Sequence, residues 1–173
     1  MVYGNPARIH GYSGAAKSTP AGGAVASIET GELAGGARLI RIRRAEDMRG
    51  SLTAIEFGSD LPFVPARLFS VFGVRSAEVR GEHAHRACQQ LLMSVSGSLS
   101  VLLDDGNSRD EVTLDDPGIG LYMPAMIWGT QFGYSQDSIL VVLASLPYDP
   151  NDYIRDYEEF LLLKGASASD LSV

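Results

Sequence analysis

From residue 37 onward, short apolar runs alternate with short polar segments. The polar segments, such as SGS, DDGNSRD and DDPG, contain residues that favour tight turns. The apolar runs are rich in β-branched and aromatic residues, which favour strands. They are ARLIRIR, GSLTAIEF, ARLFSVFGV, QQLLMSV, LSVLLDD, DEVTLD, GLYMP, MIWGTQFGY and SILVVLAS. Nine short strands at fairly regular spacing predict an all-β fold, either a sandwich or a barrel.

The period of the pattern changes near the C-terminus. Asp149 is a good N-cap, and Pro150 suits the first position of a helix. A stripe of apolar residues follows at helical spacing, and Gly165 is suited to end the helix. The stripe consists of Tyr153, Ile154, Tyr157, Phe160 and Leu161. We therefore expect a helix over 150–165 that packs one face on the barrel, followed by a loose tail over 166–173.

The chain before residue 37 has a different composition. Residues 13–36, SGAAKSTPAGGAVASIETGELAGG, consist mainly of Gly, Ala, Ser, Thr and Pro without a sustained apolar period, which predicts a flexible linker. Upstream of it, Gly4-Asn5-Pro6 is typical of a turn. An ordinary N-terminal turn is the simplest interpretation of this short segment.

Composition and charge limit the possible functions. A length of 173 residues suits one domain with a real core. The net charge of −7 argues against broad nucleic-acid binding, although a few local arginines could still bind a small anion. No apolar run approaches 18 residues, and no secretory leader opens the chain. The single cysteine, Cys88, suits a reducing compartment, so we expect a cytoplasmic protein without membrane contact.

The segment VRGEHAHRACQQLLMSVSG contains most of the candidate chemistry. His83 and His85 are two of only three histidines in the chain. Residues i and i+2 of a strand point to the same face, so both imidazoles would enter one cavity together. The alternative is a pair of partly exposed histidines on a sheet surface.

Two motifs in this region resemble those of cupins. His83, His85, Gln90 and Gly97 resemble the first cupin motif, with Gln90 in place of the usual glutamate. Gly118, Pro124, Met126 and Gly129 can be laid on the second motif, where Met126 replaces a glycine and Gly129 replaces the third metal-binding histidine. Two of four usual donors are too few to hold a divalent ion. We therefore expect neither metal nor other cofactor, and proton transfer by the two imidazoles.

Residues 41–163 resemble the WxcM-like cupins, the dTDP-4-oxo-6-deoxy-glucose 3,4-ketoisomerases. The matching stretches are RGSLTAIEF, RLFSVFGV, VRGEHAHRACQQLL, VLLDDG, GLYMPAMIWGTQ, VLAS and YDPNDYIRDYEEFL. The resemblance implies a double-stranded β-helix, or jelly-roll barrel, over 37–165. GNPARIHGY resembles the segment that closes the left-handed β-helix of hexapeptide-repeat sugar acyltransferases. Some family members resemble fusions of the two enzymes, which makes residues 1–12 a remnant of such a β-helix.

The resemblance also implies a reaction. A ketone on a dTDP-linked 4-oxo-6-deoxy sugar would move from C4 to C3 through an enediol(ate), on the route to 3-amino-3,6-dideoxy sugars. His83 and His85 would transfer the protons. Gln90 would hydrogen-bond the sugar or orient a histidine.

Four further residues are candidates for substrate binding. Arg80 and Arg67 could bind the negative charge of the enediolate or the pyrophosphate, or they could form structural ion pairs. Trp128 and Tyr122 could line the sugar or thymine pocket, or belong to the core. Family members often have other residues where this chain has Phe69, Phe72, Gln89 and Gly129, which leaves the configuration of the product at C4 open.

Two other functions remain possible at this point. A dTDP-sugar 3,5-epimerase shares the fold, but it would need a His–Asp base and a tyrosine acid, which the sequence does not place. A non-catalytic cupin that binds a sugar nucleotide would not need paired histidines. We also expect a homodimer, because LSVLLDD and SILVVLAS are too apolar to form exposed sheet edges.

Overall fold

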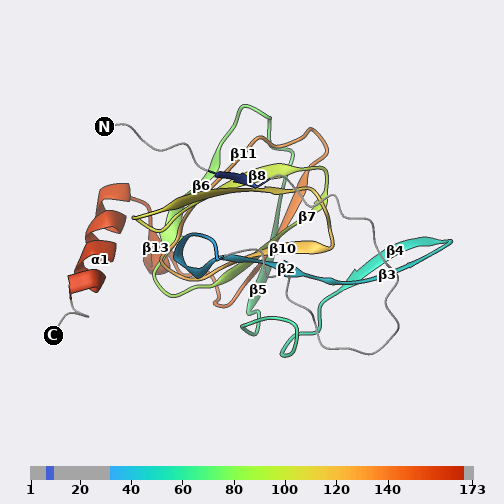
Figure 1. The fold of residues 1–173 in the computed structure, drawn as a ribbon, viewed down its shortest axis with the longest axis horizontal. Coiled ribbons are helices and arrows are strands. Elements are labelled where there is room, and N and C mark those ends of the chain that lie inside the picture. Colours follow the sequence, from blue (N-terminus) through green and yellow to red (C-terminus); the bar gives the residue numbers. More distant parts are fainter. Residues whose placement is uncertain (1–6, 10–31, 170–173) are drawn as a thin grey trace.

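The protein has two large β-sheets, a separate two-stranded sheet formed by β3 and β4, and an α-helix at one end (Figure 1). The computed structural model describes residues 7–9 and 32–169. One sheet has the strand order β1-β9-β8-β11-β6-β13 and the other has the order β2-β10-β7-β12-β5. The strands are β1 (Ala7–Ile9), β2 (Arg38–Arg41), β3 (Arg43–Asp47), β4 (Gly50–Ala54), β5 (Arg67–Phe72), β6 (Arg80–His85), β7 (Gln90–Ser96), β8 (Leu99–Asp104), β9 (Arg109–Leu114), β10 (Ile119–Met123), β11 (Trp128–Phe132), β12 (Ile139–Ala144) and β13 (Tyr153–Ile154).

The connections follow a jelly-roll pattern. Between β5 and β12 the chain crosses from one sheet to the other at every step except the β8–β9 hairpin. All described strand pairs are antiparallel except β1 with β9. The predicted all-β fold of cupin type is therefore confirmed. β6 is absent from the apolar runs because its sequence, RGEHAH, is polar.

The main core lies between the two sheets. Strands β8 and β9 contribute Val101, Leu103, Val112 and Leu114 from one side. The facing strands contribute Leu92, Leu121, Met123, Leu140 and Val142. Alternate residues of β7 instead join a second cluster on the outer face of their sheet, where Leu91 and Met93 pack with Phe63. Both faces of β7 are covered, which explains its nearly continuous apolar run.

The N-terminal part is described only at β1 and from residue 32. β1 pairs in parallel with β9, from Ala7 opposite Asp110 to Ile9 opposite Val112. Leu33 and Ala34 are buried in the main core, so the final residues of the predicted linker 13–36 belong to the barrel. The rest of the predicted linker and β-helix remnant lies outside the described residues, and both assignments stay predictions.

The predicted C-terminal helix is wrong in its limits. Asp149 does act as a cap, accepting from the N–H of Asn151, but the element it caps is a short 3-10 turn, η2 (Pro150–Asp152). The next two residues form β13, which pairs with β6. Because the backbone of β13 is engaged in the sheet, it cannot at the same time continue a helix.

The α-helix begins later and ends later than predicted. α1 (Tyr157–Ser169) follows Asp156, whose carboxylate accepts from the N–H of Glu159 in the manner of an N-cap. Gly165 lies within α1 instead of ending it. Phe160 is buried against Ile154 and Ala84, which fixes α1 beside β6 and β13. No helix among the described segments is long and apolar enough to cross a membrane.

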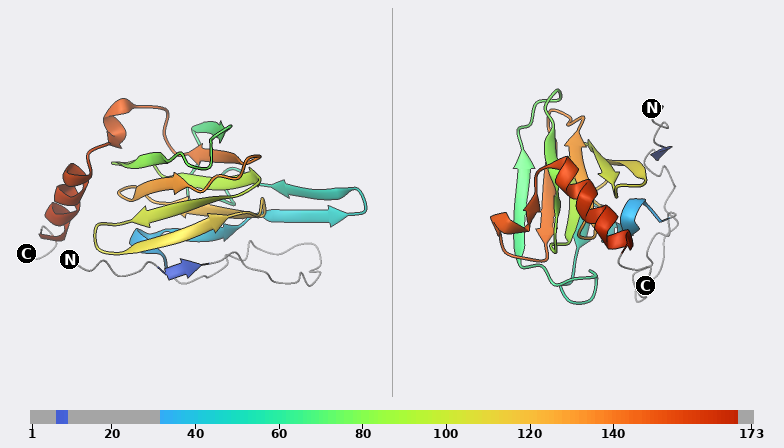
Figure 2. Two further views of the ribbon diagram at one scale, coloured as in Figure 1. Left: turned by 90° about the horizontal axis from the view of Figure 1, so that it is seen from above. Right: turned by 90° about the vertical axis from the view of Figure 1, so that its left-hand side faces the viewer.

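The β3–β4 hairpin projects from the barrel at the end opposite α1 (Figure 2). Every residue of β3 is exposed. The two apolar strands whose exposure at a sheet edge would favour aggregation are internal. β8 lies between β9 and β11, and β12 lies between β7 and β5. That reason for a dimer is therefore wrong. The edges of the five-stranded sheet are instead β2 and β5, and β5 exposes Leu68 and Phe72.

Candidate active site

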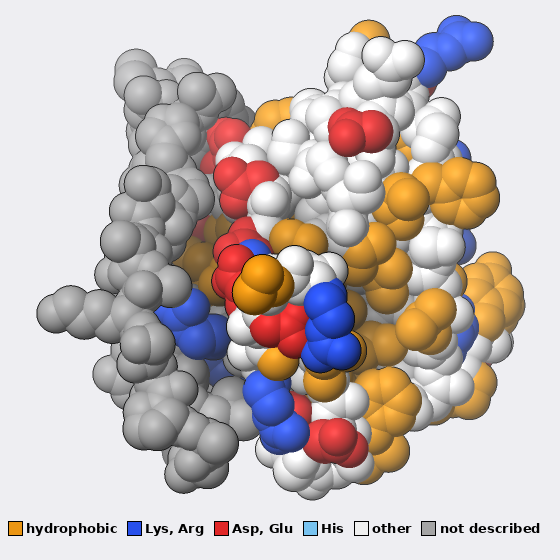
Figure 3. Space-filling model, turned by 90° about the vertical axis from the view of Figure 1, so that its right-hand side faces the viewer, with side chains coloured by type: hydrophobic (Ala, Val, Ile, Leu, Met, Phe, Trp, Pro, Cys, Tyr) orange, Lys and Arg blue, Asp and Glu red, His pale blue; other side chains and the backbone are white. Residues whose placement is uncertain are grey.

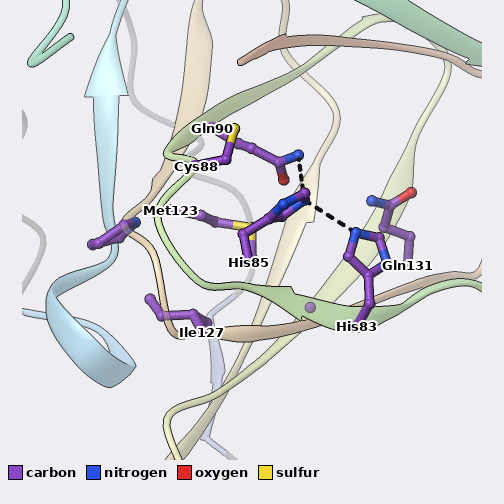
Figure 4. Close-up of a pocket in the computed structure, with 9 residues that line it drawn as sticks. His83, His85, Cys88, Gln90, Met123, Ile127 and Gln131 are labelled. Carbon is purple, nitrogen blue, oxygen red and sulfur yellow. Dashed lines mark hydrogen bonds between the residues drawn. The ribbon is translucent and has the colours of Figure 1, made fainter. Parts of the chain in front are cut away.

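A small pocket opens between the two sheets, beside β6 and β11 (Figure 4). Both predicted histidines and Gln90 line it, so the interpretation of His83 and His85 as a pair in one cavity is correct. The lining residues are His83, His85, Cys88, Gln90, Met123, Pro124, Ile127, Gly129 and Gln131.

A bulge in β6 places His83 in the pocket. His83 lies opposite Gly129, whereas Gly81 lies opposite the next residue, Thr130, so Glu82 is the extra residue. Gly81 and Glu82 have φ of 84° and 50°, a left-handed conformation that is unusual for Glu82. A Cβ on Gly81 would come within 2.6 Å of the Gly129 carbonyl oxygen. Close approach of the two strands thus requires glycine at position 81.

Asp152 fixes the orientation of His85. The Nδ1–H of His85 donates to Asp152 Oδ2 across 2.7 Å, and the two groups are nearly enclosed. The other oxygen, Oδ1, accepts from the N–H of Ala87 at 2.7 Å. Asp152 lies at the end of η2, and the next residue, Tyr153, pairs with His85 in the sheet. The turn η2, which the sequence predicts as the start of a helix, therefore holds this carboxylate in place.

The two imidazoles meet through their Nε2 atoms, which are 3.3 Å apart (Figure 4). The Nδ1–H of His83 donates to the carbonyl of Gly81 at 2.8 Å. The amide of Gln90 donates to Nε2 of His85 at 3.1 Å. Of the two roles that the sequence left open for Gln90, orientation of a histidine is the one this contact supports.

Burial disfavours the charged form of both histidines and lowers their pKa values. It lowers the pKa of His83 below its ordinary value, and the Arg155 charge adds to this effect against the hydrogen bond to Gly81. Burial also lowers the pKa of His85, although the hydrogen bond to Asp152 acts in the opposite direction. Asp152 itself stays ionised: burial raises its pKa, but the hydrogen bonds from Ala87 and His85 outweigh it, and the pKa lies below its ordinary value.

Tyr153 and Arg67 stand behind the histidines. The Tyr153 ring contacts both imidazoles, with centroids 4.9 Å from His83 and 4.4 Å from His85. Arg67 Nη2 lies 3.5 Å from the Tyr153 hydroxyl, and the Arg67 charge lowers the pKa of His85. Among the described residues no carboxylate pairs with Arg67, and its Nε is buried without a partner. Arg67 therefore lies behind Tyr153 and does not line the pocket.

Like Arg67, three other predicted substrate-binding residues do not line this pocket. Tyr122 faces the outer cluster, where its hydroxyl donates to Gln89, because Met123, the adjacent residue of β10, takes the inward position. Trp128 packs on α1, with its ring 5.1 Å from that of Tyr157. Arg80 is exposed near Tyr134, whose pKa it lowers against a larger opposite effect of burial.

The second cupin motif can be followed in the backbone. Met126 occupies the position of the motif's glycine and has φ of 60°, the left-handed conformation that glycine favours. Its N–H donates to the carbonyl of His85 at 2.8 Å. Gly129 faces the pocket, where the methyl of Met123 lies 2.8 Å from the place of a Cβ. Met123 thus fills the space of the missing third histidine.

A different set of possible metal ligands lies at the edge of the pocket. Donor atoms of His85, Cys88 and Asp152 lie within 4.8 Å of one another. The sequence did not indicate this group. Two of the possible donor atoms, His85 Nδ1 and Asp152 Oδ2, are already paired with each other by a hydrogen bond.

Sequence reasoning missed Asp152, Tyr153 and Gln131. Asp152 and Tyr153 lie in YDPNDYIRDYEEFL, which is part of the family resemblance. The expected helix over 150–165 did not predict that they would contact the histidines. Gln131 lies two residues after Gly129 on β11 and therefore points into the same pocket. A period-2 interpretation of this strand could have found it.

Comparison with known proteins identifies the family. The family model described as WxcM-like, C-terminal (FdtA) matches residues 35–165. The chain belongs to this family. The WxcM-like chain is 42% identical to TDP-4-oxo-6-deoxy-alpha-D-glucose-3,4-oxoisomerase of Aneurinibacillus thermoaerophilus over 123 residues, which are 71% of this chain and 88% of that protein. That relative confirms the prediction of an isomerase.

Solved structures of ketoisomerases are similar to the WxcM-like chain. The TDP-quinovose 3,4-ketoisomerase WlaRB of Campylobacter jejuni is 37% identical, with a TM-score of 0.71 over 74% of this chain and 98% of that one. A variant of the 3,4-ketoisomerase QdtA of Thermoanaerobacterium thermosaccharolyticum, in complex with TDP-4-keto-6-deoxyglucose, is 32% identical, with a TM-score of 0.74. That match covers 75% of this chain and 94% of QdtA.

Proposed function

We propose that this WxcM-like chain converts dTDP-4-oxo-6-deoxy-glucose into its 3-oxo isomer by histidine-mediated proton transfer. The observation that carries the proposal is the His83–His85 pair, which lies in the pocket with two Nε2 atoms 3.3 Å apart. The relatives act on TDP-linked sugars according to their names. A product with its ketone at C3 is suited to amination at that carbon, which fits a place before a 3-amino-3,6-dideoxy sugar.

The residues suit chemistry without a redox cofactor. The C4 ketone acidifies the hydrogen on C3, and a neutral imidazole accepts that proton as general base. The hydroxyl proton moves from O3 to O4 of the resulting enediolate, which then accepts a proton at C4 and becomes the C3 ketone. Both electrons of the broken C–H bond stay on the sugar, so C3 is oxidised while C4 is reduced.

The surrounding side chains have supporting roles. Arg67 places an unpaired positive charge beside the histidines, where it favours the developing enediolate. Gln90 orients His85 by its hydrogen bond to Nε2. We assign Tyr122 and Trp128 to packing, since their contacts are with the outer cluster and α1, and keep Arg80 as a surface contact for the nucleotide.

A 3,5-epimerase is the second candidate, and one observation favours it. The His–Asp base that such an enzyme needs has a counterpart in His85 and Asp152, with Tyr153 adjacent as a possible acid. The sequence argument against an epimerase rested on the absence of these groups and therefore no longer holds. The ketoisomerase relatives, at 42% and 37% identity, are the reason to place it second.

Proton NMR of dTDP-4-oxo-6-deoxy-glucose with the purified protein separates the candidates. We expect a new species with its ketone at C3, and the same rate after exhaustive treatment with a chelator. Solvent exchange at C3 and C5 with inversion would indicate the epimerase, and an unchanged spectrum a non-catalytic protein. Loss of activity with chelator and recovery with added zinc would overturn the metal-free proposal.

A further inference from the structure

Each histidine has one ring nitrogen committed as a donor. The partner of His83 Nδ1 is the Gly81 carbonyl, which can only accept, so this nitrogen carries a hydrogen. The partner of His85 Nδ1 is the ionised carboxylate of Asp152, so this nitrogen carries a hydrogen as well. In the neutral state, neither Nε2 atom therefore carries a hydrogen, and both can only accept.

Two bare acceptors at 3.3 Å form no hydrogen bond until a proton arrives. Gln90 donates to one of them, but its amide does not lie between the two rings. Uptake of one proton would turn the contact into a strong hydrogen bond between an imidazolium and an imidazole. A second proton would place two positive charges side by side. The pair thus behaves as one unit that takes up a single proton.

We propose that the hydrogen removed from C3 passes between the two Nε2 atoms and returns to the same sugar at C4. This inference rests on the proposed ketoisomerase function. The C3–H bond breaks and an Nε2–H bond forms, while the electron pair becomes the enediolate with its charge on O4. The hydroxyl proton moves from O3 to O4. The proton between the imidazoles then forms the C4–H bond, and the C3 ketone is restored without an external oxidant.

The short distance also fixes the face of the sugar. Groups that act on opposite faces of a planar enediolate must each stand about 3–3.5 Å from it, so they lie roughly 6 Å or more apart. Nε2 atoms 3.3 Å apart must therefore act on the same face. In the glucose configuration, return of the C3 hydrogen to C4 on its own face makes the C4 hydroxyl axial. The product would have the galactose configuration at C4.

Asp152 is the positioning residue of this relay. In Asp152→Asn, the amide oxygen can still accept from Ala87 while the NH₂ group faces His85 Nδ1. Nδ1 then has to accept, and the hydrogen of His85 moves to Nε2, where it blocks the relay. Asp149→Asn is the matched control, because Asp149 caps the same turn without touching a histidine.

The test uses substrate with deuterium at C3, in ordinary water, at less than one turnover. We expect deuterium at C4 of a galactose-configured product from the wild-type protein and from Asp149→Asn. Asp152→Asn should lose turnover by about 10²-fold or more, and ¹⁵N NMR should show the His85 hydrogen on Nε2. Product without deuterium at C4, or with the glucose configuration, would overturn the relay while leaving the ketoisomerase function intact. Absence of any 3-oxo product would instead reject the proposed function.

A structural role for Asp152 alone predicts a different result. In that case Asp152→Asn would slow turnover, but the product it still forms would carry deuterium at C4 in the wild-type proportion, and the ¹⁵N signals of His85 would be unchanged. That outcome would remove Asp152 from the relay.

Discussion

The ring of Tyr153 lies against the imidazole of His85, with the two centroids 4.4 Å apart. Its hydroxyl points to Arg67, 3.5 Å from Nη2, and not to a nitrogen of either histidine. Packing of the ring and the hydroxyl can therefore be tested separately. The distinction matters because an epimerase would use the hydroxyl as an acid, whereas the proposed ketoisomerase needs only the ring.

We predict that Tyr153→Phe keeps turnover within about tenfold of the wild-type rate, because the ring that supports both histidines remains. Turnover of Tyr153→Ala should fall about 10²-fold, since the imidazoles lose the ring they pack against and are held less firmly against the substrate. Initial rates of ketone migration measure both. A loss in Tyr153→Phe as large as that in Tyr153→Ala would make the hydroxyl an acid and favour the epimerase candidate.

Replacement of either histidine should remove most activity without unfolding the protein. His83→Asn and His85→Asn should each lose about 10²–10⁴-fold, the usual contribution of general acid–base catalysis. The two losses should differ, because abstraction at C3 and return at C4 are different steps. Single-turnover rates measure the losses, and circular dichroism checks the fold. Near-normal rates in both variants would place the catalytic groups elsewhere.

Activity should persist below pH 6.5. Burial lowers the pKa of both His83 and His85, so the neutral pair survives to a lower pH than free imidazole would. Stability should change in the corresponding direction: below pH 6.5 the unfolded chain binds more protons than the folded one, so the free energy of unfolding falls as pH falls. Urea titrations at pH 7.5 and 5.5 measure this slope. The double variant His83→Asn/His85→Asn should show a smaller slope, and an equal slope would contradict the assignment.

Replacement of Gly81, in the bulge of β6, should destabilise the protein more than replacement of a glycine such as Gly133. Gly133 also has positive φ, 63°, but a Cβ there meets no atom within 4 Å. Gly133→Ala should therefore lower the free energy of unfolding by only about 1–2 kcal/mol, the strain of an alanine in the left-handed conformation. Gly81→Ala should lower the free energy of unfolding, measured by urea titration, clearly more, because its Cβ would lie 2.6 Å from the Gly129 oxygen. Equal losses in the two variants would show that the strand contact can relax.

We predict a homodimer, now on the basis of exposed apolar groups. The edge strand β5 leaves Leu68 63% and Phe72 68% exposed, and unpaired apolar edges favour association. Figure 3, which views the end with the β3–β4 hairpin, shows hydrophobic side chains gathered along one side. Light scattering at micromolar concentration should give twice the chain mass. Phe72→Glu should weaken the dimer, whereas Leu162→Glu on the exposed side of α1 should not; a wild-type monomer would refute the prediction.

The sequence by itself determined the elements whose signal is local. Apolar runs such as the one in β7 predicted strands because burial on both faces leaves a continuous pattern. The spacing of His83 and His85 placed both imidazoles on one face, since side chains alternate along a strand.

Only the tertiary structure decided what surrounds the histidines. Asp152 reaches His85 from 67 positions away along the chain, and only because β13 pairs with β6. The residues around Asp149 favour a helix locally. Pairing of β13 with β6, which no local sequence pattern indicates, outweighs that preference. The same long-range pairing turned Tyr122 and Trp128 away from the pocket, because the inward position beside each of them is taken by Met123 and Gly129. Strand register, which depends on partners distant in sequence, therefore decided which side chains form the site.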